Sequence, residues 1–211
     1  VAMFRGSVPY LLVLALWLPG AALSENAADL IAGALADSEQ HEALANEGAK
    51  ASFFCANCHG EDGNSRIGEV PNLAGQHPVY IHNQISAFVQ GVRKDPFMEG
   101  LMRVLSEREK ASIAVYYANS SVRPATAQAG SRADEGARFY VEFCARCHGD
   151  RARGSTEYPR LAGQQPEYLR INLQRYLTMS GERIYPAMTG AVRQLGERNF
   201  DAVIDYLSSL D

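Results

Sequence analysis

Two short segments of the chain combine cysteine and histidine at a spacing that suits one kind of chemistry. Residues 55–59 read CANCH and residues 144–148 read CARCH, so each segment has two thiols three positions apart with a histidine directly after them. Two such thiols can add to the two vinyl groups of a haem, while the histidine reaches the iron from the same side. The spacing predicts covalent haem attachment through Cys55, Cys58, Cys144 and Cys147, and iron binding by His59 and His148.

Other uses of the four cysteines explain the sequence less well. A zinc site built from both pairs would join ligands 86 positions apart, from Cys58 to Cys144, and would need no histidine beside each pair. A thioredoxin-type redox pair needs a βαβ setting, which the sequence does not indicate. Two disulfides are common in an exported protein, but they explain neither the histidines nor the repeat described next.

The two motifs belong to a tandem repeat that organises most of the chain. PNLAGQ at residues 71–76 returns as PRLAGQ at residues 159–164, and Met98 returns as Met188, each followed by glycine two positions later. The offsets between the copies are 88 to 90 residues, which indicates the duplication of one unit. We expect the backbone carbonyls of Pro71 and Pro159 to accept a hydrogen bond from the ring of the haem-binding histidine, unless these prolines only shape a loop.

The repeat also selects the candidate ligands for the second face of each iron. Met98 and Met188 are the methionines that occupy the same place in both copies, so we expect them to bind iron. Ordinary core packing is the alternative for both, and Met102 competes with Met98 in the first copy. The histidines without a counterpart in the second copy are interpreted as surface or loop residues: His41, His77 and His82. Two irons with His and Met ligands leave no position for a substrate, so the prediction is electron transfer, with no catalytic residue.

The hydrophobic pattern is helical throughout, and no strand alternation is visible. Short helices are expected over residues 48–54 and 135–143 before the two motifs, and longer ones over 78–93 and 166–178, each beginning with proline. Ser106 and Glu109 form a predicted capping box for the last helix of the first copy. The predicted fold is all-α, with two small domains that are each wrapped around one covalent haem.

The two ends of the repeat set the predicted domain boundaries. Residues 25–121 form a first domain, of which 25–45 are an extension, residues 122–133 form an exposed linker, and residues 134–211 form a second domain. Residues 1–24 carry Arg5 as their sole charge, an apolar run, and at 22–24 a triplet with small residues at its first and third positions, as a secretory signal peptide does. An uncleaved membrane anchor is the alternative, and the expected location is the periplasm.

Charge excludes one class of partner and differs between the two copies. The 211 residues have a formal charge of −4, and no basic excess is available to bind nucleic acid. Residues 25–130 contain 13 acidic and 8 basic residues, whereas residues 131–211 contain 11 of each, and all of these bases are arginine. This polarity would let the two domains face different redox partners, or it reflects solvated surface and arginines that bind haem carboxylates.

The ordered set of motifs resembles class I c-type cytochromes, and specifically the dihaem cytochrome c4 family. The resemblance covers roughly residues 46–210. It implies two cytochrome c domains joined by a linker, two haem c groups, and periplasmic electron delivery from a donor to an acceptor protein, often a membrane-bound terminal oxidase. Peripheral membrane association is compatible with this role. Two alternatives stay open: a dihaem electron-accepting subunit of a flavocytochrome or quinoprotein dehydrogenase, and a catalytic dihaem enzyme, which the paired methionines disfavour.

Overall fold

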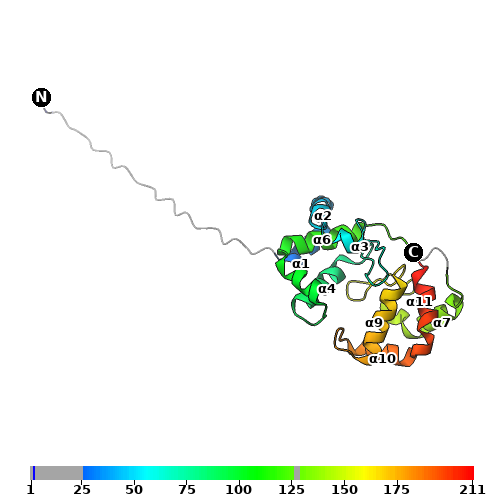
Figure 1. Cartoon of the computed structure of the whole chain (residues 1–211). Coiled ribbons are helices and arrows are strands. Elements are labelled where there is room, and N and C mark those ends of the chain that lie inside the picture. The colour runs from blue at the N-terminus through cyan, green and yellow to red at the C-terminus, as the bar shows by residue number, and fades with distance from the viewer. Residues whose placement is uncertain (1, 3–25, 126–128) are drawn as a thin grey trace.

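The computed structural model describes residue 2, residues 26–125 and residues 129–211 (Figure 1). Apart from Ala2, the predicted signal peptide therefore lies outside the described residues. In these ranges the chain is helical and contains no strand, as the sequence predicts. The first lobe contains α1 (Ala27–Ala36), α2 (Ser38–Ala51), α3 (Ala56–His59), α4 (Pro78–Val89), α5 (Pro96–Val104) and α6 (Glu107–Asn119). The second lobe contains α7 (Ala133–Phe143), α8 (Ala145–His148), α9 (Pro166–Thr178), α10 (Pro186–Leu195), the 3-10 helix η1 (Glu197–Asn199) and α11 (Phe200–Ser208).

The helix before each motif crosses the last helix of the same lobe. In the first lobe α2 packs against α6, and in the second lobe α7 packs against α11. Glycine makes both crossings close: a Cβ on Gly48 would overlap the carbonyl oxygen of Ser112, and a Cβ on Gly136 would overlap that of Ala202. The same helix crossing in both lobes fixes the direction in which the chain enters each cysteine motif.

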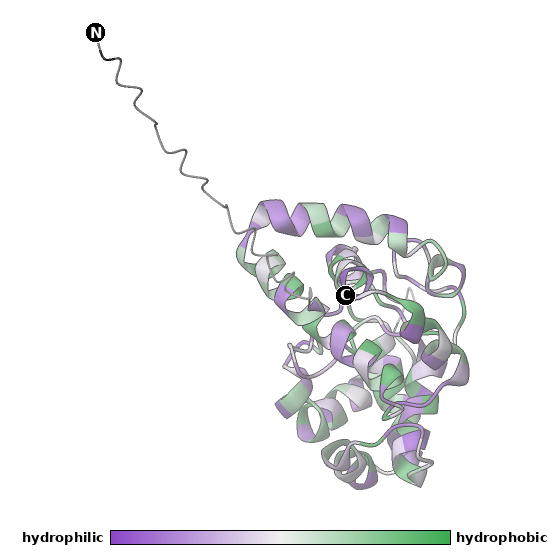
Figure 2. Ribbon diagram, turned by 90° about the vertical axis from the view of Figure 1, so that its left-hand side faces the viewer, coloured by the Kyte–Doolittle hydropathy of each residue, from purple (hydrophilic) through white to green (hydrophobic). Residues whose placement is uncertain are grey.

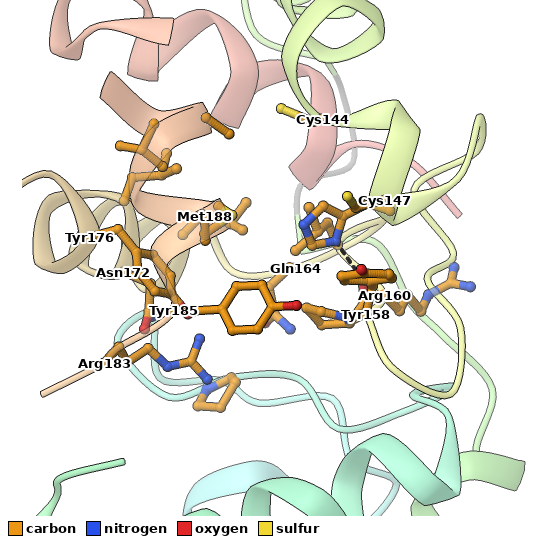
Figure 3. A pocket seen from close by; sticks show the side chains of 18 of the residues that line it. Cys144, Cys147, Tyr158, Arg160, Gln164, Asn172, Tyr176, Arg183, Tyr185 and Met188 are labelled. Atoms are coloured by element: carbon orange, nitrogen blue, oxygen red, sulfur yellow. Dashed lines mark hydrogen bonds between the residues drawn. The ribbon is translucent and has the colours of Figure 1, made fainter. Parts of the chain in front are cut away.

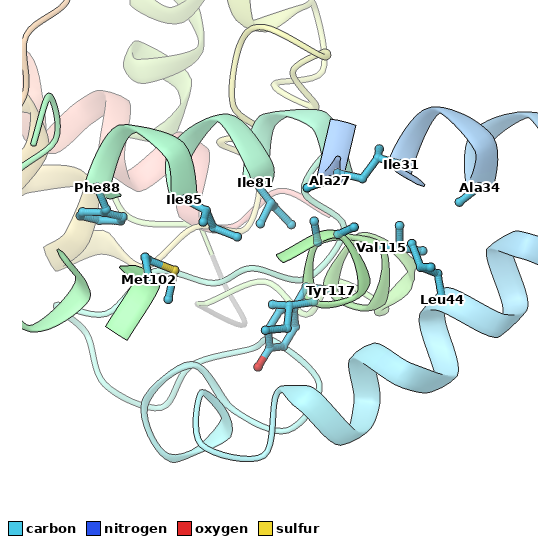
Figure 4. Packing of buried hydrophobic residues seen from close by; sticks show 13 residues of the cluster. Ala27, Ile31, Ala34, Leu44, Ile81, Ile85, Phe88, Met102, Val115 and Tyr117 are labelled. Carbon is cyan, nitrogen blue, oxygen red and sulfur yellow. The ribbon is translucent and has the colours of Figure 1, made fainter. Parts of the chain in front are cut away.

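Each lobe has its own apolar core, and the first core is enlarged by the extension. Helix α1 contributes the buried side chains of Ala27, Ile31 and Ala34 to the cluster around α4 and α6 (Figure 4). The extension is therefore helical, and it continues into α2, which begins at residue 38 rather than at 48. Figure 2 shows hydrophilic and hydrophobic residues alternating along the helices, as amphipathic helices around two cores require.

Local signals placed several helix ends correctly. Helix α9 has the predicted bounds, and the capping box of Ser106 and Glu109 is formed at the start of α6. Helix α4 starts at the predicted proline but ends at residue 89 instead of 93. The chain turns there because Gly91 adopts a positive φ of 69°, a conformation that glycine permits.

The described part of the linker is held against the lobes. Val122 is half-buried against Gly75 and Gly163, one glycine from each lobe, and neither has a Cβ to exclude it. The backbone N–H of Arg123 also donates to the side-chain oxygen of Asn64 (2.8 Å). Arg123 and Pro124 are nevertheless exposed, as expected for a linker, so Val122 is the side chain through which this segment packs on the lobes. No helix among the described residues is long and apolar enough to cross a bilayer.

Candidate haem sites

The second lobe contains a cavity of about 340 Å³ that brings the predicted residues together. Cys144, Cys147, His148 and Met188 all line it. Helix α8 carries the second cysteine and the histidine, and Met188 is the third residue of α10. Figure 3 shows Met188 facing the cysteine-bearing wall from the other side of the cavity. The residues predicted to attach haem and to bind its iron therefore surround one space.

Both predicted iron-binding histidines are buried and are oriented in the same way. The ring Nδ1–H of His59 donates to the carbonyl of Pro71 (2.9 Å), and that of His148 donates to the carbonyl of Pro159 (3.0 Å). These hydrogen bonds confirm the prediction from the repeat. Burial lowers the pKa of each imidazole and outweighs the opposing effect of the carbonyl. Each ring is thus held neutral with Nδ1 occupied, which leaves the Nε2 lone pair for a metal.

Met98 and Met188 occupy equivalent positions, whereas Met102 is equivalent to a valine. Met98 and Met188 are half-buried and are each the third residue of a helix, α5 or α10, that begins with proline. Met102 is 4% exposed and lies in the apolar core of the first lobe (Figure 4). Its counterpart Val192 is 1% exposed in the core of the second lobe. Met102 therefore fills a core position, and Met98 is the structural equivalent of Met188.

The thiols do not support the competing explanations. All four cysteines are free and half-buried, so no disulfide links them. Burial raises the pKa of the Cys55 thiol, and it raises that of Cys144 to about 12, whereas redox-active cysteines have lowered values. In the part of the chain that the structure describes, no group of three or more His, Cys, Asp or Glu residues could hold a metal ion such as zinc.

The remaining histidines are half-buried, and of the three only His77 lies outside a helix, so the interpretation as surface or loop residues holds only in part. The two ring nitrogens of His41 contact the carbonyl of Ala34 (3.1 Å) and the side chain of Asn119 (2.9 Å). The ring of His77 caps α4 by accepting a hydrogen bond from the N–H of Val79 (3.3 Å). His82 is half-buried on the same helix.

The repeated glutamines, to which the sequence analysis gave no role, join the two lobes. The side chain of Gln164 accepts from the N–H of Asn72 (2.7 Å) and donates to its carbonyl (3.0 Å). Reciprocally, Gln76 accepts from the N–H of Arg160 (2.6 Å) and donates to its carbonyl (3.1 Å). Each glutamine thus binds the residue that follows the histidine-binding proline of the other lobe, and we call these four bonds the glutamine lock. Their appearance at the same place in both copies is the signal that could have revealed them.

The lining of the cavity fits a large, flat, mainly apolar group that carries carboxylates. Leu161, Leu173 and Val203 supply apolar walls. Arg160 is buried, it lines the same cavity, and its Nε has no hydrogen-bond partner. A buried guanidinium with an unpaired donor is costly, and the carboxylate of a haem would pair with it. The residues present therefore fit haem c.

A helical fold that repeats the attachment motif, the proline-bound histidine and the paired methionine in both lobes defines a two-domain c-type cytochrome, and comparisons with known proteins agree. The family model for cytochrome c matches residues 45–116 and again residues 133–211. Cytochrome c4 of Thiocapsa roseopersicina is 32% identical over 77% of this chain and 90% of its own length. The thiosulfate dehydrogenase electron acceptor of Thiomonas intermedia (strain K12) is 31% identical over 74% of this chain and 77% of its own length.

The solved structures extend this agreement to three dimensions. The crystal structure of reduced recombinant cytochrome c4 from Pseudomonas stutzeri matches with a TM-score of 0.71 and 25% identity, over 79% of this chain and 98% of that one. The chain belongs to the dihaem cytochrome c4 family. It therefore binds two covalently attached haem c groups and is an electron carrier rather than an enzyme.

Proposed function

We propose that the protein is exported to the periplasm and passes single electrons between two redox proteins. In this proposal Cys55, Cys58, Cys144 and Cys147 attach the haems, His59 and Met98 bind the first iron, and His148 and Met188 bind the second. The chemistry that a bound haem supplies is reversible one-electron transfer. The residues of the chain hold the group, fill both faces of its iron and exclude water from it.

The observation that carries the proposal is the equivalence of the two sites. Each contains a buried neutral histidine whose Nδ1–H is fixed by a proline carbonyl at 2.9 or 3.0 Å. Each also has a half-buried methionine at the third position of a helix, α5 in the first lobe and α10 in the second. Histidine and a thioether sulfur would together hold the iron of each haem, which would favour electron transfer over substrate binding and raise the reduction potential.

Replacement of the methionines tests this ligation directly. Met188→Ala should remove the sulfur-to-iron charge-transfer absorption of the oxidised second haem and let carbon monoxide bind that iron after reduction. Met179→Ala is the matched control, because Met179 is 60% exposed and its sulfur contacts Arg193 rather than the cavity. If Met188→Ala and Met179→Ala give the same spectra as the unmodified protein, Met188 is not a ligand.

The surface around the second motif supports an acidic partner on that side. Arg146, Arg151 and Arg153 are exposed and lie within a few residues of His148. Such a cluster steers an acidic protein toward the nearby haem and raises the association rate at low salt. The double variant Arg151→Glu/Arg153→Glu should slow electron exchange with that partner at low ionic strength and have little effect at high ionic strength. A rate that stays unchanged at low salt would contradict this orientation.

A second candidate role is that of electron acceptor for a thiosulfate dehydrogenase. The similarity to the Thiomonas intermedia protein supports it, since that relative is an acceptor of this kind. A terminal oxidase would then receive the electrons. Stopped-flow mixing with a thiosulfate dehydrogenase and thiosulfate separates the two roles: rapid reduction of both haems supports the acceptor role, and slow reduction favours another donor.

Export has its own test. We expect the protein recovered from the periplasmic fraction to begin near Glu25, as cleavage after the triplet at residues 22–24 requires. An intact N-terminus in the membrane fraction would instead show an anchor.

A further inference from the structure

Two arginines at equivalent places in the repeat meet at the interface between the lobes. Arg93 and Arg183 each lie five residues before the candidate methionine ligand of their own lobe. Both side chains reach Gln84 of α4: Arg93 donates to its Oε1 at 3.1 Å, and Arg183 donates to the same oxygen at 3.1 Å. Arg93 also donates to the hydroxyl of Tyr168 across the interface (3.0 Å). We call Arg93 and Arg183 the interlobe arginine pair.

Arg93 and Arg183 bind the same oxygen, and no carboxylate among the described residues balances their charge. No ion pair of either guanidinium exists among the described residues. The nearest acidic residue in sequence, Glu182, contacts Arg175 (3.4 Å) and Ser180 instead. Two like charges that share one neutral acceptor repel each other and lose solvation, so an anion close by would stabilise the pair.

The excess of positive charge also shifts the pKa of Tyr168, which lies beside the pair. Burial alone would raise the pKa of the Tyr168 hydroxyl, but Arg183 and Arg93 outweigh burial and lower it. Burial lowers the pKa of the Arg93 guanidinium, and Arg183 adds to this effect. The space around the pair is therefore one that attracts an anion.

That space is the haem cavity of the second lobe. Arg93, Gln84 and Tyr80 belong to the first lobe, yet they line the same cavity as Cys147 and His148. The acidic residue among the described lining residues, Glu157, lies at 3.5 Å from the hydroxyl of Tyr185. The cavity of the second lobe is thus completed by side chains of the first.

The position of the pair agrees with the chemical structure of haem. The two carboxylates of haem lie on the edge of the ring opposite the vinyl groups, which the cysteines hold. Figure 3 shows Arg183 on the far side of the cavity from Cys144. A haem joined to the cysteines would direct its carboxylates toward this end of the cavity.

We propose that the interlobe arginine pair binds a carboxylate of the second haem, so that Arg93 of the first lobe completes the haem site of the second lobe. The guanidinium forks offer the paired donors that a carboxylate accepts. A cation at this edge favours the reduced haem, which carries one positive charge less than the oxidised form. Arg93 therefore raises the reduction potential of a haem that belongs to the other lobe. This inference goes beyond the proposed function, because it depends neither on the methionine ligands nor on the partner.

The test measures both reduction potentials in the full-length, haem-loaded protein. We expect Arg93→Gln to lower the reduction potential of the second haem by about 59 mV, which shifts its one-electron equilibrium about tenfold toward the oxidised form. The first haem should change as well, because Arg93 also lowers the pKa of His59, but by less than the second. Arg93→Lys keeps the charge and should retain most of the potential. Arg138→Gln is the matched control, because Arg138 is exposed on α7 in the second lobe and water screens its charge.

Several results would overturn the inference. One is a change in the second haem no larger than that of the Arg138→Gln control, and another is a larger change in the first haem than in the second. Nuclear magnetic resonance of the haem methyl groups assigns each potential to its lobe. If Arg93→Gln does not fold, Arg183→Gln serves as the second variant and should lower the same potential. Binding of carbon monoxide by either iron would count against the methionine ligands and leave this inference unaffected.

Discussion

Replacing Gln164 by alanine should loosen the contact between the two lobes. The side chain of Gln164 is 5% exposed, and it makes two of the four bonds of the glutamine lock, at 2.7 and 3.0 Å to the backbone of Asn72. Alanine would leave the N–H and the carbonyl of Asn72 without these partners in a region where Asn72 itself is buried.

The expected magnitude follows from the two groups that lose their partners. Each buried backbone group left unsatisfied costs about 1 to 3 kcal/mol, so the loss is about 2 to 6 kcal/mol if water stays excluded. Water that enters the interface would bring the loss toward the lower end of this range. Gln76→Ala should cost a similar amount, because it breaks the reciprocal pair of bonds to Arg160. The double variant should cost less than the sum, since both residues hold one interface.

Urea unfolding of the haem-loaded protein, followed by haem absorbance, measures these free energies. Gln194→Ala is the matched control, because Gln194 is exposed on α10 and its replacement should change stability by less than about 0.5 kcal/mol. The reasoning is refuted if Gln164→Ala is as stable as Gln194→Ala, or if the two glutamine effects add fully.

Two further predictions concern the helix crossings. Gly48→Ala and Gly136→Ala should each destabilise the protein by about 1 to 3 kcal/mol through overlap with the facing backbone. Gly100→Ala, with open space around it, should be neutral or slightly stabilising in the same urea unfolding assay. The hydrogen bond from Arg108 lowers the pKa of Glu47, so the stability from this pair is complete above pH 4.5 and is lost as the pH falls through the lowered value. Since the pair is largely exposed, Glu47→Gln should cost at most about 1 kcal/mol at pH 7, and the difference should vanish in acid; a constant difference down to pH 2 would show another cause.

The sequence predicted the parts of the site that depend on local chemistry and on the repeat. The spacing of cysteine and histidine specified the attachment motifs, and the similar distance to a proline in both copies, 12 and 11 residues, led to the hydrogen bonds at His59 and His148. The capping box of α6 and the start of α9 followed from residue types that act within one helical turn.

The contacts between the lobes could not be predicted in this way. Gln76 and Gln164 have no chemistry that identifies a partner, and their role depends on how the two copies face each other. Arg93 likewise lies in a loop of the first lobe, and its place in the cavity of the second lobe requires the relative orientation of both. The early start of α2 was missed because its mean hydropathy is low, so residues 38–47 resemble a polar extension.

Optical spectra of the reduced haem protein, recorded before and after addition of carbon monoxide, test the central claim most directly. With His59 and Met98 on one iron and His148 and Met188 on the other, both haems should be low-spin, and the spectrum should not change with the ligand. Binding of carbon monoxide by one haem, or a high-spin signal from it, would contradict the account. It would show that the methionine of that lobe leaves the iron open to a small molecule.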